Sequence, residues 1–218
     1  THAASGDPDE PIPFWGIAWG GGLAIARYLR DHPEVVAGRR VLDIETGEFP
    51  NVRRTFLPMA CMHCANAPCE EVCPTRATTT RADGLVAIDY ELCIGCAHCV
   101  MACPYDARSI VHAAHYAYSD EPLPSEAMRF DPARVAVSMK CNFCVDRIDE
   151  AAVTGRVPGL HPEVTPACVN SCIAGAMVFG DIHDPDSKVS RLLEATEHFR
   201  MHEELGTEPG VYYIWNQP

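Results

Sequence analysis

The sequence has no apolar run long enough to cross a bilayer, for which roughly 20 consecutive residues are needed. The best candidate, residues 14–29, contains Arg27 and three consecutive glycines. The first residues, THAASGDPDEP, do not combine a basic region with an apolar stretch, so they do not resemble a secretory signal. We therefore expect a soluble chain without a membrane span of its own.

Cationic side chains are scarce: 17 Lys and Arg stand against 30 Asp and Glu, a net charge of −13. Nucleic-acid phosphates would be repelled by such a surface, so we expect no nucleic-acid partner. Phosphate-loop motifs are missing as well. Gly20 to Gly22 precede no Lys-Ser/Thr pair and fit no G-x-G-x-x-G pattern. Close backbone packing explains these glycines better.

Cysteine, by contrast, is abundant: twelve residues fall into three groups of four. The first two groups end in Cys-Pro, namely CMHCANAPCEEVCP at 61–74 and CIGCAHCVMACP at 93–104. The third consists of KCNFC at 140–144 and CVNSC at 168–172. A C-x2-C-x2-C-x3-C-P run is typical of [4Fe–4S] clusters, which need four thiolates. The chain is therefore predicted to carry electrons.

The spacing has a physical reason. Intervals of two residues let one tight turn present three sulfurs, and Gly95 suits that turn because it has no Cβ. The fourth cysteine follows a short helical turn, so we expect it to point away and to serve the neighbouring cluster. Two such runs in tandem predict cross-ligation. The predicted ligands are Cys61, Cys64, Cys69 and Cys103 for the first cluster, and Cys93, Cys96, Cys99 and Cys73 for the second.

Two other uses of cysteine compete with this interpretation. Disulfides suit short secreted domains, but this chain of 218 residues, 47% of them hydrophobic, can bury a core without them. Structural zinc also takes paired C-x2-C units, although it seldom uses a third cysteine so close to the second. Zinc therefore remains an alternative mainly for the third group, taken in isolation.

Short elements are expected between the cysteine groups, which gives an α+β fold. Asp83-Gly84 marks a hairpin turn, and Asp186 or Ser187 can cap a helix. The predicted elements are a loose arm at 1–13, a glycine-rich then helix-like stretch at 15–29, strand–turn–strand at 39–51, a hairpin at 78–88, a helix from the third cysteine group to Gly155, a strand at 177–182, an amphipathic helix at 187–199 and a final strand within 210–216.

Beyond the cysteines, about 145 residues (49–193) resemble a known family. The string FPNVRRTFLPMACMHC, the second cysteine run, KCNFCVDRI, CVNSC and VFGDIHDPDSKVSRLL are similar to the electron-transfer subunit of the dimethyl sulfoxide reductase superfamily. The resemblance implies tandem ferredoxin-like halves, each of two-cluster type, with hairpins, insertions and a C-terminal helix. The implied segments are 1–55 (arm and degenerate first motif), 56–112 (two-cluster domain), 113–139 (insertion), 140–185 (completing the second half) and 186–218 (helix and tail on a partner).

The resemblance also implies partners. A large subunit with a molybdenum or tungsten bis-pterin cofactor performs catalysis, and a membrane-anchor or other redox subunit exchanges electrons with this non-catalytic chain. Its location is then cytoplasmic, or periplasmic by export together with a partner that carries a twin-arginine signal. The alternatives are an autonomous polyferredoxin carrier and a zinc-bearing structural module.

This chain departs from the family pattern of sixteen cysteines in four groups. Residues 24–27, Ala-Ile-Ala-Arg, stand where the first motif is expected. Twelve thiolates make three cubanes, so a third cluster is expected at Cys141, Cys144, Cys168 and Cys172. Cross-ligation would instead send Cys172 to the absent cluster and leave a [3Fe–4S] cluster or a non-cysteine ligand. We favour closure by Cys172, because an unspent thiol beside a cluster invites oxidation.

Charged and ring side chains flank the ligands. A nearby cation favours a reduced cluster, whereas an exposed one simply forms surface ion pairs. Neither His63 nor His98 has the spacing of a fourth ligand, so both are expected near the clusters or in solvent. The flanking cations are Arg76, Arg108, Lys140 and Arg147.

Overall fold

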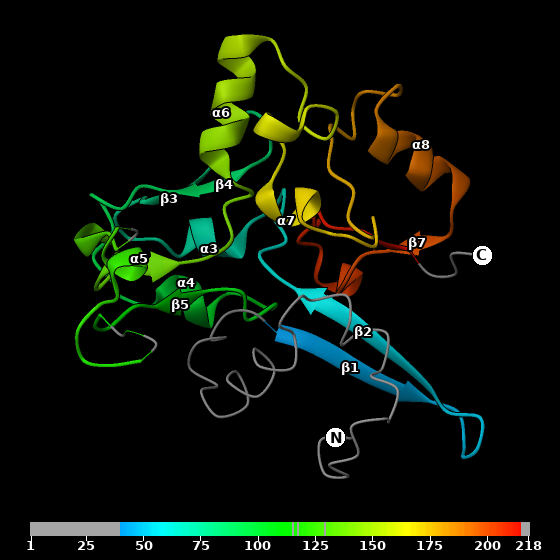
Figure 1. Ribbon diagram of the computed structural model, residues 1–218, viewed down its shortest axis with the longest axis horizontal. Coiled ribbons are helices and arrows are strands. Elements are labelled where there is room, and N and C mark those ends of the chain that lie inside the picture. The colour runs from blue at the N-terminus through cyan, green and yellow to red at the C-terminus, as the bar shows by residue number, and fades with distance from the viewer. Residues whose placement is uncertain (1–39, 115, 117, 129, 215–218) are drawn as a thin grey trace.

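A computed structural model of the chain describes residues 40–114, 116, 118–128 and 130–214. The arm, the helix-like stretch and the replaced motif that the sequence predicts lie within 1–39, outside the described residues. The described part combines short helices with two-stranded antiparallel ribbons joined by long loops (Figure 1). It is a mixture of small helices and hairpins, as expected for a ferredoxin-like fold.

The first ribbon precedes the cysteine groups. Strand β1 (Arg40–Thr46) pairs with β2 (Arg53–Met59), with Arg40 opposite Met59 and Thr46 opposite Arg53. Figure 1 shows this long ribbon reaching away from the other elements. The predicted bounds of 39–51 were wrong. The second strand begins only at Arg53, because residues 47–52 form a loop. Within this loop Gly47 has φ of 89°, and a Cβ there would meet the Asn51 carbonyl oxygen at 2.3 Å.

The hairpin predicted around Asp83-Gly84 is confirmed. Strand β3 (Thr78–Thr80) pairs with β4 (Val86–Ile88) in antiparallel register. Two further ribbons have strands of only two residues each, and in both ribbons a longer stretch of chain separates the two strands. They are β5 (Ser109–Ile110) with β6 (Ser138–Met139), and β7 (His198–Phe199) with β8 (Tyr213–Ile214).

The longer helices largely follow prediction. Helix α6 (Val145–Thr154) ends at Gly155, whose φ of 67° supplies a left-handed cap. Helix α8 (Lys188–Ala195) is capped by Ser187, whose hydroxyl accepts a hydrogen bond from the Ser190 amide at 3.1 Å. The remaining helices of the described residues are short: α3 (Pro68–Glu71), α4 (His98–Met101), α5 (Pro124–Ala127), α7 (Ala167–Asn170) and 3-10 turns at Pro132–Arg134, Pro162–Val164 and Glu203–Leu205.

Two predicted bounds near the C-terminus were wrong. Helix α8 stops at Ala195, and Phe199 belongs to β7 instead. Residues 177–180 form no regular structure. Their backbone lies against Gly159, where a Cβ would meet the Phe179 carbonyl oxygen at 1.9 Å, and this close packing replaces strand pairing. The predicted final strand is present, though shorter than expected, as β8.

The hydrophobic core surrounds sulfur atoms. Side chains from β2, the first two cysteine groups and β8 form one cluster of buried residues, with Met62 and Val86 almost fully enclosed. Among the described helices, none is long and apolar enough to cross a bilayer. Core members include Leu57, Met62, Val86, Tyr105 and Tyr213 together with Cys61, Cys64, Cys69 and Cys99.

Candidate metal centre

Four cysteines from two different runs line one small cavity. Cys61, Cys64 and Cys69 come from the first run, and Cys103 comes from the end of the second. The first three are buried, and Cys69 sits on α3 immediately after Pro68, which starts that helix. Burial raises the pKa of the Cys64 thiol to about 11. The cavity thus collects four sulfur donors in an apolar setting.

The second run forms a tight turn with a left-handed backbone at Gly95 and Ala97. Gly95 is needed for a reason that the sequence did not reveal. A Cβ there would lie 2.1 Å from the carbonyl oxygen of Ala136, in the loop before β6. Strand β6 then supplies polar contacts to this run: the Ser138 amide donates to the Cys93 sulfur at 3.5 Å, and the Ser138 hydroxyl lies 3.4 Å from the Cys99 sulfur.

The third group is more open to solvent. Cys141 and Cys168 are exposed, whereas Cys144 is half-buried. The Ala167 amide donates to the Cys144 sulfur at 3.4 Å, which brings the two parts of the group together. Although the residue as a whole is exposed, desolvation of its sulfur, together with the charges of Cys61 and Cys168, raises the pKa of Cys141. All twelve cysteines are free thiols, with no disulfide among them.

A repeated backbone unit carries the last cysteine of each group. Each unit has a four-residue helix with one cysteine at its second position and another cysteine four residues later. The third residue after that later cysteine has a positive φ, and the next amide, from an alanine, points at its sulfur. The units are Cys69/Cys73/Arg76/Ala77, Cys99/Cys103/Asp106/Ala107 and Cys168/Cys172/Gly175/Ala176.

Amide donors at these sulfurs are the kind of contact that stabilises a thiolate. The Ala107 and Ala176 amides lie 3.5 Å and 3.3 Å from the sulfurs of Cys103 and Cys172. Burial alone would raise the pKa of Cys73, but hydrogen bonds from nearby amides and the Thr75 hydroxyl lower it overall. The shared C-x3-A spacing is visible in the sequence, although sequence reasoning missed it.

The repeat bears on Cys172. Cys103 occupies this place in its unit and lies with the cysteines of another run. Cys172 has the same backbone setting, which favours an orientation away from Cys168 and its group. The closure by Cys172 that the sequence favours would require a departure from the pattern of the other two units.

Of the four flanking cations, two are withdrawn from solvent beside the sulfurs. Arg108 is only 3% exposed and donates to the Cys69 sulfur at 3.1 Å. Lys140 is half-buried and donates to the carbonyls of Val86 and Cys141. Arg76 is exposed. Arg147 donates to the carbonyls of Pro162 and Thr165 and so braces the loop before α7.

His63 is buried and has a fixed tautomer. Its Nδ1 accepts a hydrogen bond from the Val86 amide at 3.1 Å, so the ring proton is on Nε2, which donates to the Cys141 carbonyl at 3.1 Å. The ring stacks on Phe143 with centroids 3.8 Å apart. Burial, reinforced by the charge of Lys140, lowers the pKa of His63 to about 3. His63 thus links the first and third groups as a neutral side chain, whereas His98 is exposed.

A C-terminal segment closes over the first group, which the sequence did not predict. The amides of Ala65 and Asn66 donate to the carbonyls of Glu208 and Thr207, and the Gly210 amide donates to Met62 at 2.7 Å. The Thr207 hydroxyl also hydrogen-bonds Cys64. Contacts across such long sequence separations leave no local pattern to read.

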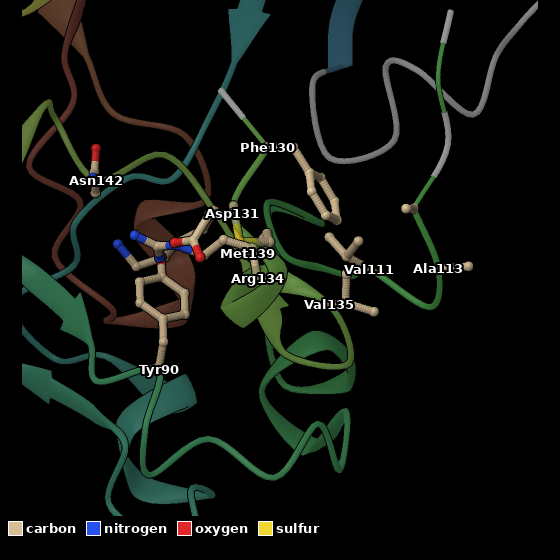
Figure 2. A pocket seen from close by; sticks show the side chains of 11 residues that line it. Tyr90, Val111, Ala113, Phe130, Asp131, Arg134, Val135, Met139 and Asn142 are labelled. Carbon is tan, nitrogen blue, oxygen red and sulfur yellow. The ribbon is translucent and has the colours of Figure 1, made fainter. Parts of the chain in front are cut away.

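A cavity of about 600 Å³ lies away from the sulfurs, between the insertion and the start of the third group. Figure 2 shows Arg134 and Asp131 beside the ring of Tyr90, with Phe130 and Val111 on the other side. The Arg134 guanidinium carbon is 3.4 Å from the ring centroid. No cysteine lines this cavity, so it is separate from the sulfur-lined site.

The donor set fits an iron–sulfur cluster. Thiols from two runs line one apolar cavity, and amide or guanidinium donors reach the sulfurs, as cluster thiolates require. Within the described residues, no three His, Cys, Asp or Glu side chains are grouped so as to hold a single metal ion. A bound cluster would accept and release single electrons, while this chain supplies its ligands, burial and charge.

Comparisons with known proteins agree with this chemistry. The model of the 4Fe-4S dicluster domain matches residues 52–118. Similar proteins include the B subunits of three oxidoreductases. That of selenate reductase from Mesobacillus selenatarsenatis is 39% identical over 194 residues, covering 84% of this chain and 62% of that protein. That of sulfite dehydrogenase from Allochromatium vinosum is 36% identical over 197 residues, covering 90% and 71%. That of tetrathionate reductase from Salmonella typhimurium is 38% identical over 165 residues, covering 75% and 53%.

The chain thus spans about three fifths of the length of the first of these relatives. Its match to the sulfite dehydrogenase relative extends over most of both proteins. The spacing of the cysteine groups, the sulfur-lined cavity and these similarities all indicate an iron–sulfur protein. The chain belongs to the iron–sulfur B subunits of the dimethyl sulfoxide reductase family, which bind 4Fe–4S clusters through their cysteine groups and transfer electrons within multi-subunit oxidoreductases.

Proposed function

We propose that this chain relays single electrons through three clusters between a catalytic subunit with a molybdenum or tungsten bis-pterin cofactor and a quinone-linked membrane subunit or another redox partner. The observation that carries the proposal is the cavity shared by cysteines of two runs. Cross-ligation of that kind ties two clusters into one compact unit, which suits stepwise transfer. The names of the relatives as B subunits support a catalytic partner.

The cavity supports the first proposed ligand set, and the cysteine spacing and the repeated unit support the second. Cys61, Cys64, Cys69 and Cys103 hold the first cluster, and Cys93, Cys96 and Cys99, with Cys73 from the first run, hold the second. Cys141, Cys144 and Cys168 supply three thiolates of the third. The thiol count assigns Cys172 as their fourth partner, whereas its place in the repeated unit matches that of Cys103, which lies with cysteines of another run. Ligation by Cys172 would give a [4Fe–4S] third cluster, and its absence would give a [3Fe–4S] cluster.

Exposed apolar side chains beside the second and third groups support docking to partner subunits. Ile94 and Met101 are 65% and 75% exposed, and Ile173, next to Cys172, is 76% exposed. Residues 113–139 are the proposed partner-facing insertion. Of the tail expected on a partner at 186–218, residues 207–213 instead pack on the first cysteine group of this chain. An autonomous polyferredoxin carrier would have less need of such surface.

Native purification tests the proposal. The chain should be isolated from its source under anaerobic conditions, and the iron, sulfide, molybdenum and tungsten contents and size of the complex measured. We expect a brown complex in which this chain is accompanied by a large molybdenum- or tungsten-containing subunit. A brown protein that elutes at the size of the monomer would support the carrier instead, and a colourless zinc protein would refute both.

A further inference from the structure

Arg108 is a buried cation whose polar neighbours include thiol groups. Its Nη2 donates to the Cys69 sulfur at 3.1 Å, and its Nη1 donates to the Thr78 hydroxyl at 3.1 Å. Within the described residues, no carboxylate forms an ion pair with it. Although burial opposes it, the charges of Cys69, Cys99 and Cys61 raise the pKa of Arg108.

Arg108 lies near cysteines of two proposed ligand sets. Cys69 belongs to the proposed first ligand set, whereas Cys99 belongs to the second. Arg108 donates to the Cys69 sulfur and lies close enough to Cys99 for its pKa to be raised by the charge of that thiolate. Its side chain also lines the cavity of the first set. A buried cation with no carboxylate partner among the described residues needs negative charge close by, and two thiolate-bound clusters would supply it.

Lys140 has a similar position between the first and third groups. Its ammonium donates to the carbonyl of Cys141 at 2.9 Å and to that of Val86, which lies in the core around the first set. Burial lowers the pKa of Lys140, while the charges of Cys61 and Cys141 oppose that change. As for Arg108, no described carboxylate is within ion-pair distance of this side chain.

We propose that the charges of Arg108 and Lys140 each set the potentials of two clusters. Arg108 acts on the first and second clusters, and Lys140 acts on the first and third. The inference rests on the ligand sets of the proposed function. Reduction adds negative charge to a cluster, and a buried cation stabilises that charge more than it stabilises the oxidised state. Each cation therefore raises two midpoint potentials more than it raises the remaining one.

The test is a potentiometric titration followed by electron paramagnetic resonance on the intact complex. Signals are first assigned by their loss in Cys64→Ser, Cys96→Ser and Cys144→Ser. We expect Arg108→Met to lower the midpoint potentials of the first and second clusters, and Lys140→Met to lower those of the first and third. Arg76→Gln is the matched control, because it removes a solvent-screened cation close to Cys73 and should shift none of them.

Several outcomes would overturn the inference. Unchanged potentials in a fully loaded Arg108→Met complex would do so, as would equal shifts of all three clusters in both variants. If Arg108→Met loses iron, Arg108→Gln and Arg108→Lys are compared. Iron retained in Arg108→Lys but not in Arg108→Gln supports the role of the charge, with Lys140→Met then testing the pairing of potentials. Iron lost from Arg108→Lys as well would show that the shape of the guanidinium group, and not its charge, is required, and would overturn the inference.

The same measurements distinguish failure of this inference from failure of the proposed function. A parent complex without cluster signals or iron would refute the proposed function itself. A parent complex with clusters whose potentials ignore both cations would refute only this inference.

Discussion

The hydroxyl groups of Tyr105 and Thr207 lie 2.5 Å apart in the interior, although 102 residues separate them in the sequence. Tyr105 follows the second cysteine run, and the Thr207 hydroxyl also hydrogen-bonds Cys64 of the first. The Tyr105 hydroxyl further donates to the Met201 carbonyl at 3.2 Å. One buried polar pair therefore joins both runs to the C-terminal segment.

Tyr105→Phe should destabilise the folded chain by about 1–2 kcal/mol, because it leaves the buried Thr207 hydroxyl and Met201 carbonyl without this partner. Urea unfolding of the loaded protein measures the loss. Tyr212→Phe is a suitable control, since Tyr212 is only half-buried and its ring contacts are retained. Equal stability of the two variants would contradict the importance of the pair.

Gly95→Ala should destabilise the protein by about 3 kcal/mol or more and reduce the iron held by the second run, because its Cβ would meet the Ala136 carbonyl oxygen. Gly155→Ala separates strain from collision. Gly155 has nearly the same φ, 67° against 65°, but open space where the Cβ would stand. We expect it to cost about 1 kcal/mol and to leave the iron content unchanged. Unfolding curves and iron assays on both variants make the comparison.

Cys172→Ser should retain the iron content of the parent, because Cys172 has the same place in the repeated unit as Cys103, which lies with cysteines of another run. Cys144→Ser, which removes a proposed ligand, should lose iron from the third cluster. Iron assays and paramagnetic resonance of both variants, prepared anaerobically, provide the measurement. If Cys172→Ser instead converts a [4Fe–4S] signal into a [3Fe–4S] signal, Cys172 closes the third cubane, as the thiol count suggests.

Iron retention by the first group should weaken as the pH falls. With a pKa of about 11 in the iron-free chain, the Cys64 thiol holds its proton at neutral pH, and cluster binding must release it. Below that pKa, this one thiol should change the apparent affinity by about tenfold per pH unit, with stronger retention at higher pH. Competition against an iron chelator at pH 7, 8 and 9 measures the slope. A slope of zero would show that no thiol proton is displaced.

Local chemistry made much of the fold predictable. The hairpin around Gly84 and the end of α6 at Gly155 follow from residues within a few positions of each other. The spacing of the second run also predicted a turn that needs Gly95. Its close contact, Ala136, lies in the loop before β6, and nothing near residue 95 indicates it.

The environment of the sulfurs was less accessible to sequence reasoning. Arg76 and Arg108 look alike beside their cysteines, yet one is exposed and the other almost fully buried. Burial depends on which segments pack together in the fold, and the spacing of residues along the sequence does not indicate it. The same holds for Thr207, whose contact with Cys64 depends on the return of the chain to the first group.

The segment that closes over the first group has a consequence for the order of maturation. The Gly206 carbonyl that receives the Asn66 side chain is synthesised 140 residues after it. Until the ribosome has passed that point, the loop carrying Cys61 and Cys64 lacks its cover and stays accessible to the proteins that deliver iron and sulfide. A cluster loaded before that point would then be sealed in place by the arrival of the C-terminal segment.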